Sequence, residues 1–278
     1  MPPQRGYQID LTYLITTPVQ IDGPDSGGTG FFFHIDTNSY LITAGHVLAD
    51  GEKDGYGEEL KSEIRQNPPE LSYYLRDIDE ITNVSRFTVD LSADHRIWGF
   101  DPNGADVAAI QIDETLSPLT DFINSDEDDY DHQYGSFSLM EHEFVANKRL
   151  RTDRVFTVGY PGRLYDIQTK FPIKRNALLA SPPHFDFEGE ERFLTDARMD
   201  PGTSGSPVLI KASQVLHPWG EHLSQETPVL LGIHSGNFPH VGSPESQDEC
   251  LRNTRYSDLN ETWRPESIVR TIQNAVTS

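Results

Sequence analysis

The feature that most constrains this chain is a glycine-punctuated turn at residues 200–208, which reads DPGTSGSPV and runs directly into an apolar segment. Its central serine, Ser204, lies between small residues, with Gly202 and Gly205 nearby. Glycines allow successive backbone N–H groups to point toward one place, so this turn can hold a nucleophilic hydroxyl beside donors for an oxyanion. Taken alone, the same residues also fit an ordinary turn between two strands.

Two upstream segments provide the partners that an activated serine needs. His46 directly follows the mostly apolar segment 39–45, and Asp106 directly precedes the apolar segment 107–112. A histidine can remove the serine proton, and a carboxylate can orient the imidazole ring. Three other aspartates compete with Asp106, but none is followed by so strong an apolar run, which would anchor the carboxylate at the start of a buried strand; they are Asp90, Asp94 and Asp101.

The order of the three groups along the chain is histidine, aspartate, serine. This is the order of chymotrypsin-like double barrels, and it differs from the orders of subtilisins and α/β-hydrolases. The segments 43–46, 106–110 and 202–207 resemble the three signature segments of trypsin/chymotrypsin-fold serine peptidases. Residues 195–205 resemble the disulfide-free bacterial branch, which includes the protease domains of HtrA-type enzymes. We expect no PDZ domain of the kind that HtrA proteases carry.

The resemblance implies an all-β fold made of two antiparallel six-stranded β-barrels, a chymotrypsin-like double barrel, with a C-terminal α-helix. The length of 278 residues accommodates this arrangement. We divide the chain into an N-terminal barrel carrying His46 and Asp106 (1–115), an acidic linker and surface excursion (116–150), a C-terminal barrel carrying Ser204 (151–262) and a helix (263–278).

Local patterns predict the individual elements. A hairpin around Thr37 and Asn38 delivers His46, and residues 49–86 are polar enough to suggest irregular surface with at most a short helix. The acidic run 126–131 does not match a calcium loop and is better explained as a solvated surface. The predicted strands cover 7–21, 30–36, 39–43, 87–91, 97–100, 107–112, 154–159, 176–181, 191–196 and 228–237, and the predicted helix begins near Pro265.

Charge and composition limit the partners. The chain has 44 acidic and 22 basic residues, for a net charge of −22. Binding to a nucleic-acid backbone requires basic patches, so we expect no nucleic-acid partner. Lysine is scarce, which fits either a high-salt environment or simple repulsion between molecules. The histidines show no zinc-type spacing, so we assign no metal and no cofactor.

The cellular location is inferred from what the chain lacks. A single cysteine, Cys250, cannot form an intramolecular disulfide, which favours a reducing compartment. The N-terminal residues contain no apolar signal core, and no stretch approaches the ~18 apolar residues of a membrane span. We therefore expect a cytoplasmic protein without a membrane partner, and we expect its proteolysis to be restrained by a regulatory partner or a stimulus that the sequence does not name.

The predicted function is hydrolysis of peptide bonds by a serine endopeptidase through an acyl-enzyme intermediate. Ser204 is the expected nucleophile, His46 the general base and then acid, and Asp106 the group that fixes the imidazole. The N–H groups of Gly202 and Ser204 are the expected oxyanion hole. Two alternatives remain open: a catalytically silent peptide-binding module or chaperone on the same fold, and a hydrolase that acts on esters instead of peptides.

The substrate preference is expected to depend on the segment around His234, which resembles the pocket strand of glutamyl endopeptidases and of viral proteases that cut after glutamine. An imidazole there could donate a hydrogen bond to a Glu or Gln side chain. Arg198, at the family's pocket floor, would favour a carboxylate, whereas Met199 would favour small aliphatic residues. The expected substrate-binding residues are Arg198, Met199, His234, Ser235 and Gly236.

Overall fold

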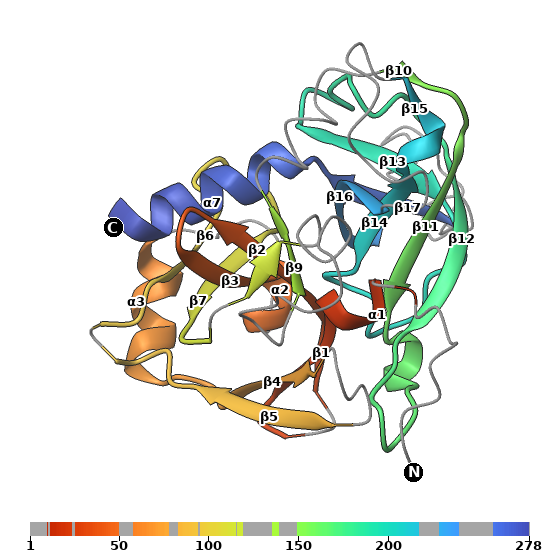
Figure 1. Cartoon of the computed structure of the whole chain (residues 1–278). Coiled ribbons are helices and arrows are strands. Elements are labelled where there is room, and N and C mark those ends of the chain that lie inside the picture. Colours follow the sequence, from red (N-terminus) through yellow and green to blue (C-terminus); the bar gives the residue numbers. More distant parts are fainter. Residues whose placement is uncertain are drawn as a thin grey trace, which may run out of the picture.

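The computed structural model describes residues 10, 12–23, 26–49, 58–77, 83–93, 95–114, 116–118, 135–138, 149–216, 228–238 and 258–277. These residues form two β-sheet units that lie side by side, the first built from the N-terminal half of the chain and the second from the C-terminal half (Figure 1). The chain is therefore almost entirely of the β class, as the sequence predicts.

The first unit is, within the described residues, a nine-stranded sheet with the central order β5-β4-β1-β2-β3-β7-β6. Neighbouring strands of this path are antiparallel, whereas β9 joins β2 in parallel and β8 pairs with β9. The strands are β1 (Thr16–Ile21), β2 (Gly27–Ile35), β3 (Asn38–Thr43), β4 (Leu71–Arg76), β5 (Val84–Val89), β6 (Trp98–Phe100), β7 (Ala108–Ile112), β8 (Ser117–Pro118) and β9 (Gly135–Ser138).

The second unit is a closed barrel with the order β11-β12-β13-β17-β16-β14, and every pairing in it is antiparallel. A two-stranded sheet, β10-β15, lies outside the barrel path. The strands are β10 (Arg149–Leu150), β11 (Arg154–Gly159), β12 (Ile173–Leu179), β13 (Arg192–Asp196), β14 (Pro207–Lys211), β15 (Val215–Leu216), β16 (Pro228–Asn237) and β17 (Leu259–Trp263).

The double-barrel prediction is confirmed as a fold class, with one correction. The second unit is the expected six-stranded barrel, but the first does not close in the described part of the chain, because its path ends at β5 on one side and β6 on the other. The C-terminal helix packs on β6 and β7, where Ala275 approaches the Cα of Gly99. This helix covers the β6 end of the sheet (Figure 1), which sequence patterns did not indicate.

Four α-helices lie in the described residues. A one-turn helix α1 (Thr12–Ile15) precedes β1, another, α2 (Gly45–Leu48), carries His46, and α3 (Glu58–Gln66) lies beside the first sheet. The C-terminal helix α7 (Pro265–Thr277) buries residues at a spacing of three to four, which include Ile268 and Ile272. In the part of the chain that the structure describes, no helix is long and apolar enough to cross a membrane.

Several predicted boundaries were wrong. In the described part of the expected first strand at 7–21, α1 is followed by β1. The segment 49–86, expected to be irregular with at most a short helix, contains α3, β4 and the first half of β5. Part of the excursion at 116–150 pairs with the first sheet through β9. The run 126–131 and Cys250 lie outside the described residues, and the division into four domains stays a prediction.

Apolar side chains on alternating faces explain how the two units meet. Phe32 of β2 points into the core of the first unit, whereas Phe31 and Phe33 belong to a second core shared with the barrel. Likewise Leu209 of β14 lies in the shared core, between two residues of the barrel interior, Val208 and Ile210. Because both faces of these strands are buried, they read as continuous apolar runs. The apolar side chains on one face of these strands therefore meet at the boundary between the units.

A buried arginine also joins the two units. Arg76, at the end of β4, is 1% exposed, and its guanidinium donates hydrogen bonds to the carbonyl oxygens of Tyr13, Thr16, Thr169 and Lys170 and to the Tyr160 hydroxyl. All of its acceptors are neutral. Burial raises the pKa of the Tyr160 phenol to about 12, so the phenol keeps its proton and can itself donate to the Thr16 carbonyl at 3.1 Å.

We expect Arg76→Met to lower the free energy of unfolding by about 3 kcal/mol or more, because it leaves several buried acceptors without donors. The matched control is Arg86→Met in β5, where the side chain is 47% exposed and the cost should stay below about 1 kcal/mol. Urea unfolding of both variants measures the difference. Equal, small shifts in the two midpoints would contradict the joining role of Arg76.

Candidate active site

His46 and Asp106 form a close pair at the boundary between the units. His46 follows β3 on α2, and Asp106 precedes β7, the strand that pairs with β3. The His46 Nδ1 atom lies 2.7 Å from Asp106 Oδ2, and the His46 backbone N–H donates to Asp106 Oδ1 at 2.8 Å. Because a carboxylate only accepts, Nδ1 carries the ring proton, which leaves the Nε2 lone pair free to accept another.

The Asp106 carboxylate is almost completely buried, with 2% of its side chain exposed. Besides His46, it accepts a short hydrogen bond from the Ser235 hydroxyl. The competing Asp101 is also buried, but its carboxylate pairs with Arg270 of α7 at 2.8 Å. Asp90 is exposed and bonds to Ser92, while Asp94 lies outside the described residues. The structure thus brings Asp106, and neither of the other described candidates, to His46.

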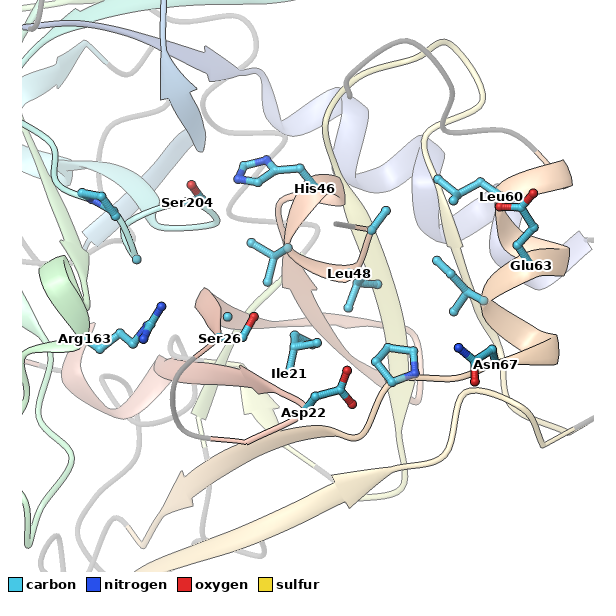
Figure 2. A pocket seen from close by; sticks show the side chains of 17 residues that line it. Ile21, Asp22, Ser26, His46, Leu48, Leu60, Glu63, Asn67, Arg163 and Ser204 are labelled. Carbon is cyan, nitrogen blue, oxygen red and sulfur yellow. The ribbon is translucent and has the colours of Figure 1, made fainter. Parts of the chain in front are cut away.

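Ser204 lies in the turn before β14, and its hydroxyl faces the His46 ring across a cleft (Figure 2). The described structure contains no hydrogen bond between the Ser204 hydroxyl and the His46 ring. Such contacts are often long without substrate. The turn depends on glycine at Gly205, where φ is +88° and a Cβ would lie 2.0 Å from the Thr29 carbonyl oxygen. Only glycine therefore fits directly after the serine.

The backbone around Ser204 leaves two donors available. The Pro201 carbonyl accepts a hydrogen bond from Gly162 N–H at 2.7 Å, and the Thr203 carbonyl accepts one from Ser206 N–H at 2.9 Å. In a trans peptide the N–H points away from the carbonyl, so these bonds direct the N–H groups of Gly202 and Ser204 to the other side. Neither of these N–H groups has a partner within the described part of the chain. Both N–H groups can therefore bind an oxygen atom that approaches Ser204, as the donors of an oxyanion hole do.

Thr29 is a residue at this site that sequence analysis missed. Its side chain is fully buried in β2, and its hydroxyl donates to the Gly202 carbonyl at 2.8 Å while accepting from Tyr160 N–H at 3.1 Å. Its backbone N–H donates to the Ser204 carbonyl at 2.8 Å. One residue of the first unit thus holds two peptides of the Ser204 turn. No local pattern could have revealed it, because its partners lie more than 120 positions away.

The predicted substrate-binding residues differ in their placement. Met199 and His234 are buried, at 7% and 2% exposure, and Ser235 contacts Asp106. The His234 backbone accepts from Gly205 N–H and donates to the Ser206 carbonyl, both at 2.8 Å, so β16 borders the Ser204 turn. Gly236 follows in the same strand.

Arg198 does not fit the expected pocket floor. Its side chain is 85% exposed, and its nearest ionic partner is the Asp200 carboxylate at 3.9 Å. The guanidinium therefore lies in solvent, and it gives no support for recognition of a buried carboxylate.

No group of three or more His, Cys, Asp or Glu side chains in the described ranges is arranged to hold a metal ion.

Residues 28–216 match the sequence profile of the trypsin-like peptidase domain. The chain belongs to this family. The matched range of this trypsin-like peptidase domain contains His46, Asp106 and Ser204, and it begins next to Thr29. No curated protein matches the chain by sequence.

Solved structures similar to this trypsin-like peptidase domain include other proteases. The MamO protease domain from Magnetospirillum magneticum is 14% identical, with 93% of this chain and 96% of that one covered and a TM-score of 0.48. Deg5 is 14% identical, with 96% and 90% covered and a TM-score of 0.49. The thermostable serine protease AL20 from an extremophilic microorganism is 11% identical, with 96% and 100% covered and a TM-score of 0.49. These values are too low to bear on activity.

We expect Thr29→Val to slow the reaction of Ser204 with a fluorophosphonate by about tenfold or more, because the Gly202 peptide loses its donor and the oxyanion hole loosens. Thr29→Ser keeps the hydroxyl and should stay within a few-fold of the wild type. Labelling rates and thermal midpoints are measured together. If the valine and serine variants label equally fast at matched stability, the hydroxyl has no role in positioning.

Proposed function

We propose that this trypsin-like peptidase domain is an active serine endopeptidase that uses His46, Asp106 and Ser204 as its catalytic triad. The observation that carries the proposal is the alignment of a buried carboxylate, an imidazole with a free Nε2 and a facing hydroxyl beside two unpartnered N–H groups. A protein of the same fold without catalytic activity would not need these groups to be aligned with one another. Family membership supports peptide bonds as the substrate.

The first half of the proposed reaction forms an acyl-enzyme. The Ser204 oxygen attacks the scissile carbonyl carbon as His46 Nε2 takes the hydroxyl proton. Negative charge develops on the carbonyl oxygen, where the Gly202 and Ser204 N–H groups can bind it, each worth on the order of 3 kcal/mol. Asp106 stabilises the imidazolium without taking the proton itself. His46 then gives its proton to the amine nitrogen, and the C–N bond breaks.

The second half returns the enzyme to its starting state. His46, neutral again, removes a proton from a water molecule, whose oxygen attacks the acyl carbon. The same two N–H groups stabilise the second tetrahedral species. Its collapse releases the carboxylic acid and restores the Ser204 hydroxyl with the proton held by His46. The whole cycle requires only side chains and backbone groups of this chain.

We further propose that the residue before the scissile bond is Glu or Gln, with a small aliphatic residue as the competing preference. Support for the first comes from His234, a buried imidazole on the strand that borders the Ser204 turn. Support for the second comes from the apolar side chain of Met199, which is buried. The Met199 sulfur lies 3.9 Å from the Thr157 hydroxyl. Arg198 contributes to neither.

The triad proposal predicts that a fluorophosphonate labels one serine, and that Ser204→Ala abolishes both labelling and cleavage of an internally quenched peptide library. Ser204 is a partly exposed turn residue, so the alanine variant should unfold like the wild type. The control, Ser213→Ala, removes an exposed hydroxyl from the same barrel and should keep both activities. Labelling that survives in Ser204→Ala would contradict the proposal, and turnover of esters alone would identify a non-peptidase hydrolase.

The specificity proposal predicts that His234→Ala lowers cleavage after Glu or Gln by about tenfold or more relative to cleavage after Val, because the buried donor is lost. The ratio of the two rates on one peptide series is the measurement, since it cancels losses of folded protein. A wild-type preference for Val or Ala that ignores the substitution would show that the aliphatic alternative is correct.

A further inference from the structure

A cleft of about 770 Å³ opens beside Ser204 and extends to α3. Its floor is apolar and largely buried, with Ile21 of β1 and Leu48 of α2 below the catalytic histidine and Leu60 of α3 at the far wall (Figure 2). The volume is large enough for more than one amino-acid side chain.

The cleft lies on the leaving-group side of Ser204. In the proposed function, where His234 receives the residue before the scissile bond, the acyl part of a substrate lies toward β16, whose Ser235 contacts Asp106. His234 borders the Ser204 turn, yet no β16 residue lines the cleft. The cleft is instead lined by His46 and by the residues that follow it on α2. Because His46 protonates the departing amine, the chain that follows the scissile bond must leave on this side.

Arg163 forms the wall of the cleft nearest to the oxyanion hole. It lies in the turn Pro161–Arg163, which is fixed to the Ser204 turn by the hydrogen bond from Gly162 N–H to the Pro201 carbonyl. A Cβ on Gly202 would lie 3.3 Å from the Arg163 nitrogen. Arg163 also has a φ of +59°, a left-handed conformation that is strained for a non-glycine residue. Its backbone is thus held in one place beside Ser204.

The Arg163 guanidinium is free to bind a ligand. It extends into the cleft toward Ser26 (Figure 2), and no carboxylate in the described residues pairs with it. The acidic side chains of the cleft, Asp22 and Glu63, lie on the walls formed by β1 and α3. Asp22 is occupied in accepting a hydrogen bond from Glu70 N–H at 2.8 Å. In a chain of net charge −22, an unpaired cation at this position is the feature that attracts a negative group.

We propose that Arg163 selects substrates that carry a carboxylate within the first two residues after the scissile bond. This inference rests on the proposed peptidase function and adds the chemistry of the leaving group to it. A planar guanidinium binds a carboxylate through two parallel hydrogen bonds, which fixes orientation as well as charge. The apolar floor then receives the neighbouring side chain. The carboxylate can belong to an Asp or Glu side chain or to the C-terminus of a short leaving group.

The test compares peptides that share one acyl part. Their leaving groups carry Glu or Gln at the first or second position, each with a free or an amidated C-terminus. The ratio of kcat/KM for Glu over Gln should be about fivefold in the wild type, as expected of a partly exposed ion pair. The ratio should fall to one in Arg163→Gln and below one in Arg163→Glu. Preference for the free C-terminus alone would identify the terminal carboxylate as the ligand.

The matched control is Arg154→Gln, which removes the same charge from the other end of β11, at an exposed position outside the cleft. It should keep the wild-type ratio. A wild type that prefers neither Glu over Gln nor a free over an amidated C-terminus, a preference that survives in Arg163→Gln, or an equal loss in Arg154→Gln would each overturn the inference.

A binding measurement separates this inference from the proposed function. The same Glu and Gln peptides, uncleaved, are titrated into Ser204→Ala protein and into Ser204→Ala carrying Arg163→Gln. Tighter binding of the Glu peptide that depends on Arg163 supports the inference even if Ser204 proves unreactive. Equal binding of the two peptides, together with cleavage by the wild type, would leave the peptidase function standing and remove Arg163 from it.

Discussion

The hydrogen bonds made by Thr29 are the interaction on which the site depends. A serine turn on one sheet and a histidine on another react only if the two sheets keep a fixed separation, since a shift of 1 Å can cost a large part of the rate. Thr29 in β2 fixes it by binding the carbonyls of both Gly202 and Ser204. Nearby, Phe31 and Phe33 of the same strand pack into the core that the two units share. Packing of apolar side chains brings the two units together. The Thr29 hydrogen bonds then fix the relative position of the two units at the candidate site.

The sequence alone indicated those candidate site residues whose positions depend on their neighbours along the chain. Gly205 must be glycine because of its positive φ and the nearby Thr29 carbonyl, and this explains why the Ser204 turn is legible in the sequence. Asp106 could be chosen over Asp101 from the apolar run that follows it, and the structure pairs Asp106 with His46 while Asp101 holds Arg270. In each case the informative residues are neighbours along the chain.

The remaining parts escaped prediction because they are contacts between distant segments. The Thr29 hydroxyl bonds a residue 173 positions away, and Arg76 bonds one 94 positions away. Neither residue type is unusual for its strand, so no pattern indicated its partner. The expectation for Arg198 failed for a related reason: family position predicted where its Cα lies, but only the structure shows that the side chain points into solvent. The packing of α7 on β6 and β7 is likewise a contact between distant segments.

One segment connects the proposed oxyanion hole with the proposed binding site for the leaving group. The residues from Tyr160 to Lys170 are bound at both ends by Arg76, and between these ends Gly162 holds the Pro201 carbonyl while Arg163 faces the cleft. A ligand on Arg163 therefore binds a segment that also directs the Gly202 N–H. Because Arg76 is buried and its acceptors are neutral, it holds the segment in place without bringing in a carboxylate that would compete with a substrate for Arg163.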